Sequence, residues 1–261
     1  MRNISNATTN RRDHVASLEK GLQALSCFGR YHTKLTVTDV ARLTEVSAAS
    51  ARRSLLTLQT MGYLDSDGKH FWMQSRVLLL AHSFLASRPM PSLAQPLLDA
   101  LSERTRESAS LGQLLDDDVI IIARSTARRS LSTGLGIGSR LPAYASATGR
   151  VLLAGLPARE AHQRLADMAR VAWTPHTTTG LEPLQKLLAQ CRHQGWALSN
   201  EELEPGVRSM AVPVRDRSGT VVAAMSIVVR AERMHLREFQ QTLLTPLMRA
   251  RDTLETHLYP N

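Results

Sequence analysis

Residues 38–72 read TDVARLTEVSAASARRSLLTLQTMGYLDSDGKHFW. The apolar residues Val40 and Leu43 have helical spacing, and Ser47 is typical of the N-cap of a further helix, which Gly62 ends. The DSDG turn that follows separates two short stretches that are typical of β-strands. Two helices joined by a short turn and followed by a hairpin indicate a helix-turn-helix with a wing.

A third helical pattern precedes this stretch and completes the domain. It begins at Ser17, which we expect to be its N-cap, and it ends at Gly29. Four apolar residues recur at the three- and four-residue spacing that is typical of a helix: Leu18, Leu22, Leu25 and Phe28. Residues 14–75 are therefore predicted to form a winged helix-turn-helix domain.

The helix that follows the N-cap serine has two unlike faces. Its inward face carries Ala51, Leu55 and Leu58. The opposite face carries only small residues and two arginines: Ser47, Ala48, Ala49, Arg52 and Arg53. A helix with a small leading turn can enter the major groove, about 12 Å wide, where arginine pairs with guanine or phosphate. We expect these residues to bind DNA; the alternative is a surface helix with two solvated arginines.

The hairpin supplies a second set of candidate DNA contacts. Lys69 and His70 stand at its tip, where we expect them to contact the DNA backbone or the minor groove.

Composition limits the classes of protein to which the chain can belong. It has 261 residues, which suggests two domains, and a net charge of +9, which indicates nucleic acid or an anionic membrane surface as partner. Residues 1–13 lack periodicity, and we expect a flexible basic arm. No apolar run is long enough to span a membrane, no signal peptide is evident, and the two cysteines are far apart, so we expect a cytoplasmic protein.

An apolar stretch and a second domain follow the wing. Residues 76–86, RVLLLAHSFLA, are more apolar than one small domain needs, so we expect a linker helix over residues 76–91 that packs against a second copy and is broken at the PMP of residues 89–91. Residues 92–261 alternate strands and helices, which predicts an α+β domain. Its expected helices cover residues 92–104, 146–154, 181–194 and 236–258, the last broken or kinked at Pro246, and its strands cover residues 109–115, 119–124, 196–200, 208–214 and 220–230.

No motif in this half specifies catalysis, a metal or a cofactor. The three aspartates at residues 116–118 are better explained as a hairpin tip than as a metal site. Gly134, Gly136 and Gly138 form a GxGxG, but Pro142 follows instead of a helix, so the pattern fails as a dinucleotide site. There is no HExxH and no GxSxG.

One longer stretch, GWALSNEELEPGVRSMAVPVRD, resembles the IclR family of bacterial transcriptional regulators. The family pattern is Gly, three residues, Asp or Ser, two residues, Glu, six residues, then Cys, Ser or Ala, and Gly195, Ser199, Glu202 and Ser209 match it. Arg215 departs from the aromatic residue or His that the pattern prefers. The resemblance covers the chain after the arm, and DGKHFW and GSRLPAYASATGRVLLAGLP are most similar to the branch that controls aromatic-acid catabolism.

The resemblance implies a GAF-like effector-binding domain at the C-terminus. By matching motifs, its pocket takes Ala147 and Thr148 at a helix N-terminus, Ser199, Glu202, Ser209, Ser226 and Val228. A helix N-terminus suits a carboxylate, and serine hydroxyls suit other oxygens. Some family pockets have Asp and Cys in the places of Ser199 and Ser209, so their ligands do not transfer. Arg124 or Arg150 is a candidate counter-ion, with a surface salt bridge as the alternative.

The implied partners are a double-stranded DNA operator, a small organic acid, a second copy of the chain in a dimer or tetramer and, for an activator, RNA polymerase. Acids of that branch are protocatechuate, 4-hydroxybenzoate, cis,cis-muconate and β-ketoadipate. Two alternatives stay open. One is a repressor of another pathway, such as that of glyoxylate or a sugar acid, and the other is an enzyme that acts on a small acid.

Overall fold

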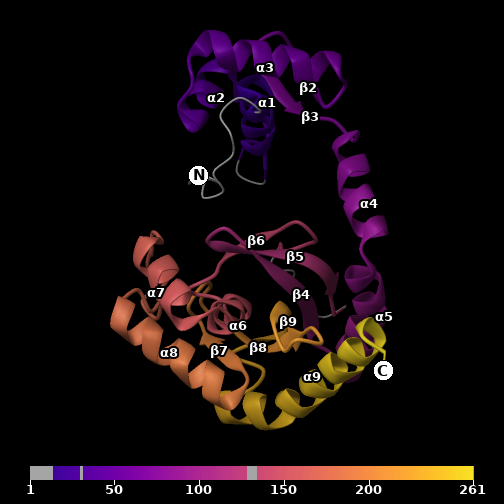
Figure 1. Ribbon diagram of the computed structural model, residues 1–261, viewed down its shortest axis with the longest axis vertical. Coiled ribbons are helices and arrows are strands. Elements are labelled where there is room, and N and C mark those ends of the chain that lie inside the picture. The colour runs from indigo at the N-terminus through magenta and orange to yellow at the C-terminus, as the bar shows by residue number, and fades with distance from the viewer. Residues whose placement is uncertain (1–13, 30–31, 128–133, 261) are drawn as a thin grey trace. The chain divides into compact units, whose positions relative to one another are not determined.

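The computed structural model describes residues 14–29, 32–127 and 134–260. The chain divides into two compact units, Met1–Ser87 and Arg88–Asn261, and Figure 1 labels the elements of both. The basic arm that we expected at residues 1–13 lies outside the described residues. No described helix is both long enough and apolar enough to cross a lipid bilayer.

The N-terminal unit is the predicted winged helix-turn-helix. Thr36 caps α2 in a reciprocal capping box with Asp39, and Glu45 ends that helix in the left-handed region with a φ of 55°. Ser47 caps α3, and Gly62 follows it with a φ of 76°. Its elements are α1 Ala16–Ser26, β1 Leu35–Thr36, α2 Val37–Thr44, α3 Ala48–Thr60, β2 Leu64–Ser66 and β3 His70–Met73, and its strands form a sheet in the order β1-β3-β2.

The first helix differs from the prediction in its start, and only part of its apolar spacing is buried. Val15, not Ser17, is its N-cap residue. Leu18 and Leu22 are 61% and 54% exposed, while Ala24 and Phe28 are buried in the core of the unit. Leu18 and Leu22 therefore share the helical spacing of Phe28 but lie outside the core of the unit. The core of this unit is small. Ala24 and Phe28 are the side chains of the first helical segment and its end that are buried in it against α3.

Helix α4, Val77–Ser87, has no buried residue. Leu78, Leu79, Leu80 and Phe84 are 42–67% exposed on it. The helix ends at Ser87, shortly before the prolines that we expected to break it. The next helix, α5 Pro89–Thr105, begins at these prolines and not after them, because proline is well accommodated in the first turn of a helix.

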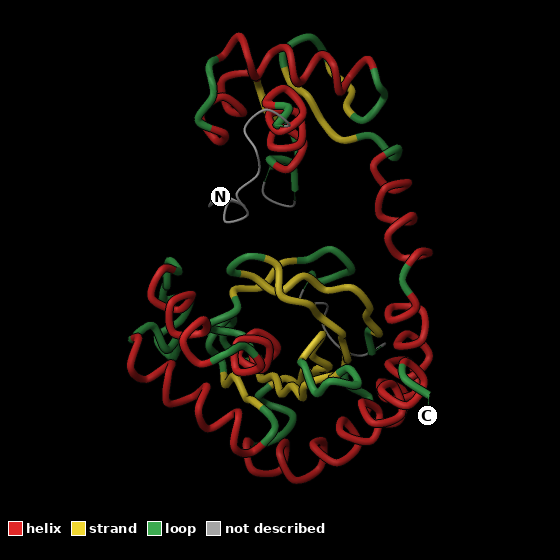
Figure 2. Tube along the Cα trace, viewed as in Figure 1, coloured by secondary structure: helices red, strands yellow, loops and turns green. Residues whose placement is uncertain are grey.

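The C-terminal unit is an antiparallel six-stranded sheet between two layers of helices (Figures 1 and 2). The sheet has the order β6-β5-β4-β9-β8-β7. After α5 its elements are β4 Ser108–Leu115, β5 Asp118–Ser125, β6 Arg140–Pro142, α6 Ala147–Gly155, α7 Ala158–Asp167, α8 Leu181–Gln194, β7 Ala197–Asn200, β8 Val207–Arg215, β9 Val221–Arg230 and α9 Leu236–Leu258.

Each face of the sheet has its own hydrophobic core. Side chains of α5 and α9 pack with Leu111, Met210 and Met225 on one face. Helices α6, α7 and α8 pack with Ala211 and Ala224 on the other. Successive residues of a strand point to opposite faces, so membership of one core fixes the face of every second residue along the strand.

Three features of this unit were not predicted. Strand β6 and helix α7 had no place in the expected element order, although Ala161 and Leu165 bury one side of α7. Helix α9 is unbroken, with Pro246 inside it. Buried Leu243, Leu247 and Leu254 hold α9 along its length against the sheet, which compensates for the hydrogen bond that the proline cannot donate.

Candidate functional site

The outward face of α3 is exposed and small, as the sequence predicted. Ser47 accepts a hydrogen bond from the backbone N–H of Ser50 at 3.3 Å, which leaves its hydroxyl proton able to reach a phosphate. Ala48, Ala49, Arg52 and Arg53 are exposed. Neither arginine forms an ion pair with a residue that the structure describes. The face therefore offers two free guanidinium groups beside a flat leading turn.

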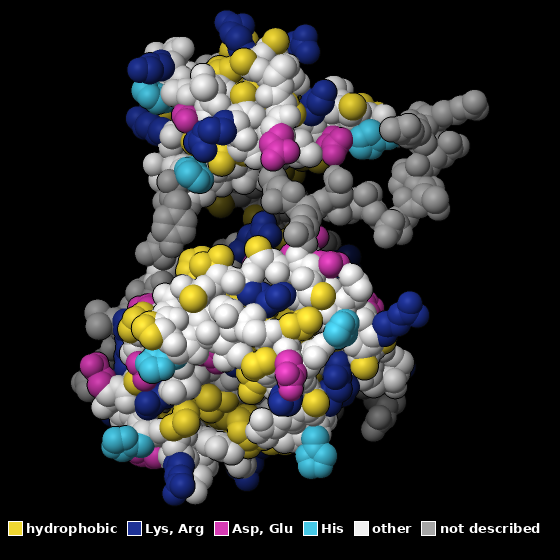
Figure 3. Space-filling view, turned by 90° about the vertical axis from the view of Figure 1, so that its left-hand side faces the viewer, with side chains coloured by type: hydrophobic (Ala, Val, Ile, Leu, Met, Phe, Trp, Pro, Cys, Tyr) yellow, Lys and Arg dark blue, Asp and Glu magenta, His cyan; other side chains and the backbone are white. Residues whose placement is uncertain are grey.

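The opposite face of α3 fixes the helix in the unit. Ala51 and Leu55 are buried, as is Val40 of α2, and Phe71 of the wing joins the same core. Because α2, α3 and the wing share one core, the exposed residues of α3 and the wing keep a fixed spacing. The unit also carries much of the charge: residues 1–87 include eleven Lys and Arg against six Asp and Glu. Figure 3 shows Lys and Arg side chains at several points of its surface.

A hydrogen-bonded turn shapes the tip of the wing. Asp67 accepts from the backbone N–H of His70 at 2.7 Å and of Lys69 at 2.9 Å. These two bonds lower the pKa of Asp67 to about 2. At the base of the wing, the ammonium of Lys34 lies 4.7 Å from the centre of the Trp72 ring. The turn at residues 65–68 was predicted, but the hydrogen bonds of Asp67 and the contact of Lys34 with Trp72 were not. An Asp two residues before a hairpin lysine is a signal for such bonds.

The lowered pKa of Asp67 leads to a pH prediction for the wing. Its carboxylate contributes stability above the ordinary pKa of an aspartate, and the contribution is lost as the pH falls from about 4 toward 2. We expect Asp67→Asn to unfold at a lower urea concentration than wild type at pH 5–7, and the difference to shrink below pH 4. Urea unfolding of the N-terminal unit at a series of pH values checks this. A difference that is independent of pH would contradict a role for the charge.

The strands of the C-terminal unit bring the predicted serines to one face of the sheet. Ser199 pairs with Ser209, Ser209 with Val228, and Val228 with Ser108, which makes one row across four strands. In the neighbouring row, Ser226 pairs with Ser110, and Ser110 with Arg124. Their strand neighbours Ala109, Met210 and Ile227 belong to the core under α5 and α9, so both rows face α6.

The N-terminus of α6 stands over this face. Ser146 caps it by accepting from the backbone N–H of Gly149 at 3.0 Å, and Ala147 and Thr148 are buried. The helix is closely packed here. A Cβ at Gly149 would lie 2.3 Å from the backbone of Ala143, and a Cβ at Gly112 on β4 would lie 3.1 Å from the Thr148 methyl. The predicted helix end and the predicted serines are thus brought together.

Two predicted residues already have strong partners. The Ser199 hydroxyl donates to the carbonyl of Ala145 at 2.8 Å. The Glu202 carboxylate binds Arg150 through both oxygens, at 2.6 and 2.5 Å, and also accepts from the backbone N–H of Thr178 at 2.9 Å. These contacts make Glu202 and Arg150 a buried bidentate ion pair rather than groups open to a ligand.

This ion pair also fastens the segment before α8. Thr177 donates its hydroxyl to the carbonyl of Glu202 at 2.6 Å, and Thr174 donates to the carbonyl of Glu201 at 2.7 Å. Arg150 donates in addition to the carbonyls of Tyr144 and Leu198. This structural role of Arg150 could not be predicted from the sequence, because its partner lies 52 residues away in the chain.

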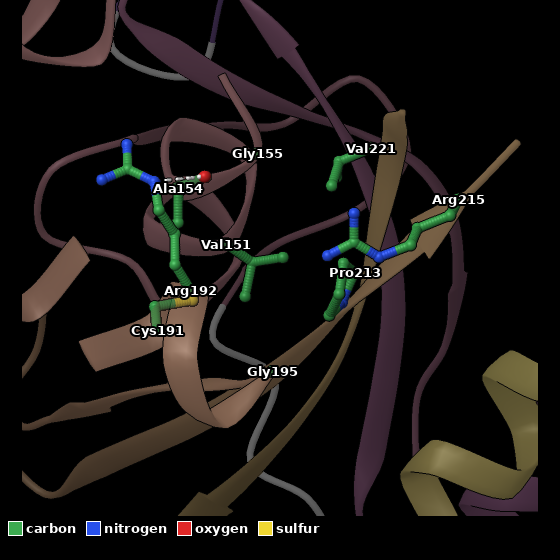
Figure 4. Close-up of a pocket in the computed structure, with 9 residues that line it drawn as sticks. All are labelled: Val151, Ala154, Gly155, Cys191, Arg192, Gly195, Pro213, Arg215 and Val221. Atoms are coloured by element: carbon green, nitrogen blue, oxygen red, sulfur yellow. Dashed lines mark hydrogen bonds between the residues drawn. The ribbon is translucent and has the colours of Figure 1, made fainter. Parts of the chain in front are cut away.

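A cavity of about 140 Å³ lies at the opposite end of α6 and is lined by none of the predicted residues (Figure 4). Arg192 donates there to the carbonyl of Ala154, and burial raises the pKa of the Cys191 thiol to about 11. The C-terminal end of a helix presents carbonyl oxygens, which disfavour an anion. Arg192 and Arg215 both line the cavity, and each donates to a backbone carbonyl, that of Ala154 and that of Gly219. The serine rows near the N-terminus of α6, which include the predicted residues, remain the better candidate.

Comparison with known sequences agrees with both units. The sequence profile of the IclR helix-turn-helix domain matches residues 17–68, and that of the bacterial transcriptional regulator IclR C-terminal domain matches residues 82–254. The chain belongs to the IclR family of bacterial transcriptional regulators. It is 38% identical over 239 residues to the Pca regulon regulatory protein of Pseudomonas putida, covering 91% of this chain and 82% of that one.

Two further similarities concern aromatic acids. The p-hydroxybenzoate hydroxylase transcriptional activator of Acinetobacter baylyi is 35% identical over 242 residues, covering 91% of this chain and 89% of the other. The crystal structure of an IclR homolog from Microbacterium hydrocarbonoxydans, complexed with 4-hydroxybenzoate, superposes with a TM-score of 0.76 at 25% identity, covering 93% of this chain and 98% of that one. Within the IclR family, the chain is thus similar to regulators of aromatic-acid catabolism.

Proposed function

We propose that this IclR-family regulator binds its operator through α3 and the wing and responds to a small organic acid from aromatic catabolism. The observation that carries the DNA-binding part is the exposed face of α3, small at its leading turn and bearing two arginines without ion-pair partners among the described residues. Arg52 and Arg53 contact base edges or phosphates, Ser47 contacts a phosphate, and the two alanines approach thymine methyls. Lys69 and His70 contact the backbone or minor groove.

Two copies bind together in this proposal. One reading helix makes few base contacts, and dimers of such domains read two half-sites. The exposed apolar side chains of α4, which have no partner in the described part of one copy, support pairing through this helix. A regulator of this kind acts in the cytoplasm, and none of its side chains is assigned a catalytic role.

The effector site lies between the serine rows and the N-terminus of α6. Ala147 and Thr148 offer backbone N–H groups and the positive end of the helix dipole, while Ser209 and Ser226 offer hydroxyls and Val228 an apolar surface. Ser199 and Glu202 hold the walls of the site through Ala145 and Arg150. The relatives' names and the 4-hydroxybenzoate complex support an aromatic acid as the effector class.

Replacing Ser209 with Phe tests the site. We expect the variant to bind operator DNA with unchanged affinity and to lose the thermal stabilisation by effector, because the ring fills the space above β8. The wild-type chain should gain about 2.7 kcal/mol from a ligand at about a hundred times its dissociation constant. The panel is 4-hydroxybenzoate, protocatechuate, cis,cis-muconate, β-ketoadipate, glyoxylate and pyruvate.

Ser125→Phe is the matched control, because Ser125 is half-buried on the same sheet but pairs with Ala109 on the other face. It should keep the response to effector. Equal loss of DNA binding and effector response in Ser209→Phe would make Ser209 a structural residue. A response to glyoxylate or pyruvate alone would retain the family and overturn the aromatic branch.

A further inference from the structure

Arg124 of β5 has an incomplete set of partners. Its Nη1 donates to the hydroxyl of Ser110 at 2.7 Å. Its Nε is buried and has no hydrogen-bond partner among the residues that the structure describes. A buried donor without an acceptor is costly, and native structures contain few of them. The Nε edge of the Arg124 guanidinium therefore has no hydrogen-bond acceptor among the described residues.

The other arginines that are withdrawn from solvent in this unit are all paired. Arg150, Arg208 and Arg230 contact the carboxylates of glutamates. Arg164 donates to the carbonyl of Asp116 and the carboxylate of Glu160. Arg170 donates to the carbonyls of Thr179 and Met168. Arg251 donates to the carbonyl of Pro213 and the carboxylate of Asp252. Arg124 differs from all six, because it has only a neutral hydroxyl.

The position of Arg124 places this group in the effector site. It is the end of the row that continues through Ser110 to Ser226, and its contact with the Ser110 side chain shows that it lies on the same face as those serines. Both serines are buried. Burial also lowers the pKa of the Arg124 guanidinium, as expected for a cation that is withdrawn from water without a counter-ion.

We infer that Arg124 is the residue that recognises the carboxylate of the effector, through its Nε edge, beside Ser110. This inference rests on the proposed response to an organic acid. A guanidinium edge matches a carboxylate in a planar, bidentate pair, which is stronger than a bond between neutral groups. The carboxylate then lies over β4 and β5, and the rest of the molecule extends along the serine rows toward Ser209. Uncharged analogues of the same shape should bind weakly.

The test compares the full-length wild-type chain with Arg124→Gln, Arg124→Lys and Arg124→Met. Each protein is titrated with 4-hydroxybenzoate, protocatechuate, cis,cis-muconate and β-ketoadipate, and with the primary amide of each acid, by isothermal calorimetry. We expect wild type to prefer an acid over its amide by tenfold or more, Arg124→Gln to lose this preference, and Arg124→Lys to keep part of it. Arg159→Gln, which removes an exposed arginine of α7, should behave as wild type.

Melting without ligand separates recognition from a structural role. Because the Arg124 guanidinium is under-satisfied, we expect the melting temperature of Arg124→Met to be equal to or above that of wild type. A fall of more than about 4 °C, roughly that of a 1 kcal/mol loss, would make Arg124 structural and overturn the inference. If Arg124→Gln kept the preference for an acid over its amide, the role of Arg124 would be overturned, while the proposed response to an acid would stand. A wild-type chain that binds none of the acids would overturn the acid response itself.

Discussion

Replacing Arg150 with Met is expected to lower the free energy of unfolding of the C-terminal unit by about 3–5 kcal/mol, since breaking a buried ion pair leaves one charge uncompensated. The side chains of Arg150 and Glu202 are 2% and 9% exposed. Without Arg150, the Glu202 carboxylate stays buried with one backbone N–H, and the carbonyls of Tyr144 and Leu198 lose their donor. The segment held by Thr177 should loosen with it.

Urea unfolding followed by tryptophan fluorescence measures this loss. Trp72→Phe in both proteins leaves Trp173 and Trp196 as reporters, and both belong to the C-terminal unit. Lys186→Met is the control, because its i,i+4 pair with Glu182 on α8 is exposed, with 76% of each side chain accessible, and should contribute less than about 1 kcal/mol. If Arg150→Met cost no more than this control, the buried pair would not hold the unit together.

Replacing Arg53 with Ala is expected to weaken binding to the specific operator by about 1–3 kcal/mol if the guanidinium pairs with a base. The loss should be larger for operator than for random DNA, because base contacts specify and phosphate contacts only position. The fold should be unaffected, since Arg53 is exposed on α3 and its removal leaves the core of Ala51 and Leu55 intact.

Arg42→Ala separates specific reading from general charge. Arg42 is also a helical arginine of this unit, with a side chain 70% exposed and 3.7 Å from Asp39. Its loss removes the same charge but should leave the ratio of operator to random affinity unchanged. Fluorescence anisotropy at one fixed salt concentration gives both affinities, since binding to DNA depends steeply on salt. An equal ratio for Arg53→Ala and wild type would exclude base reading by Arg53.

Helix α3, which we propose to read the operator, was predictable because the sequence signals that define it are local. Ser47 as N-cap, Gly62 as terminator and the alternation of Ala51 and Leu55 with Arg52 and Arg53 all act within a few residues, and the structure confirms the helix that they define. The face of α1 was not predictable in the same way. Leu18 and Leu22 have core spacing, but spacing does not say whether the surface that covers them belongs to the same copy.

The side of the sheet that carries the proposed effector site could be predicted in part, because successive residues of a strand point to opposite faces. This alternation puts Ser209 with Ala211, and Ser226 with Val228, on one side of the sheet. The partners of the charged residues did not follow, because Arg150 meets Glu202, and Arg124 meets Ser110, only after the strands have paired. The sequence gives no local signal that one arginine is neutralised and that the other is not.

In the function that we propose, operator binding by this chain is coupled to the binding of a small acid. The most direct measurement is the affinity of the full chain for an operator selected from random DNA, by fluorescence anisotropy at constant salt, with and without each acid of the panel. We expect tight, sequence-specific binding that at least one aromatic-pathway acid changes by about fivefold or more, as usual for coupled sites. Binding without sequence preference, which no acid alters, would contradict it.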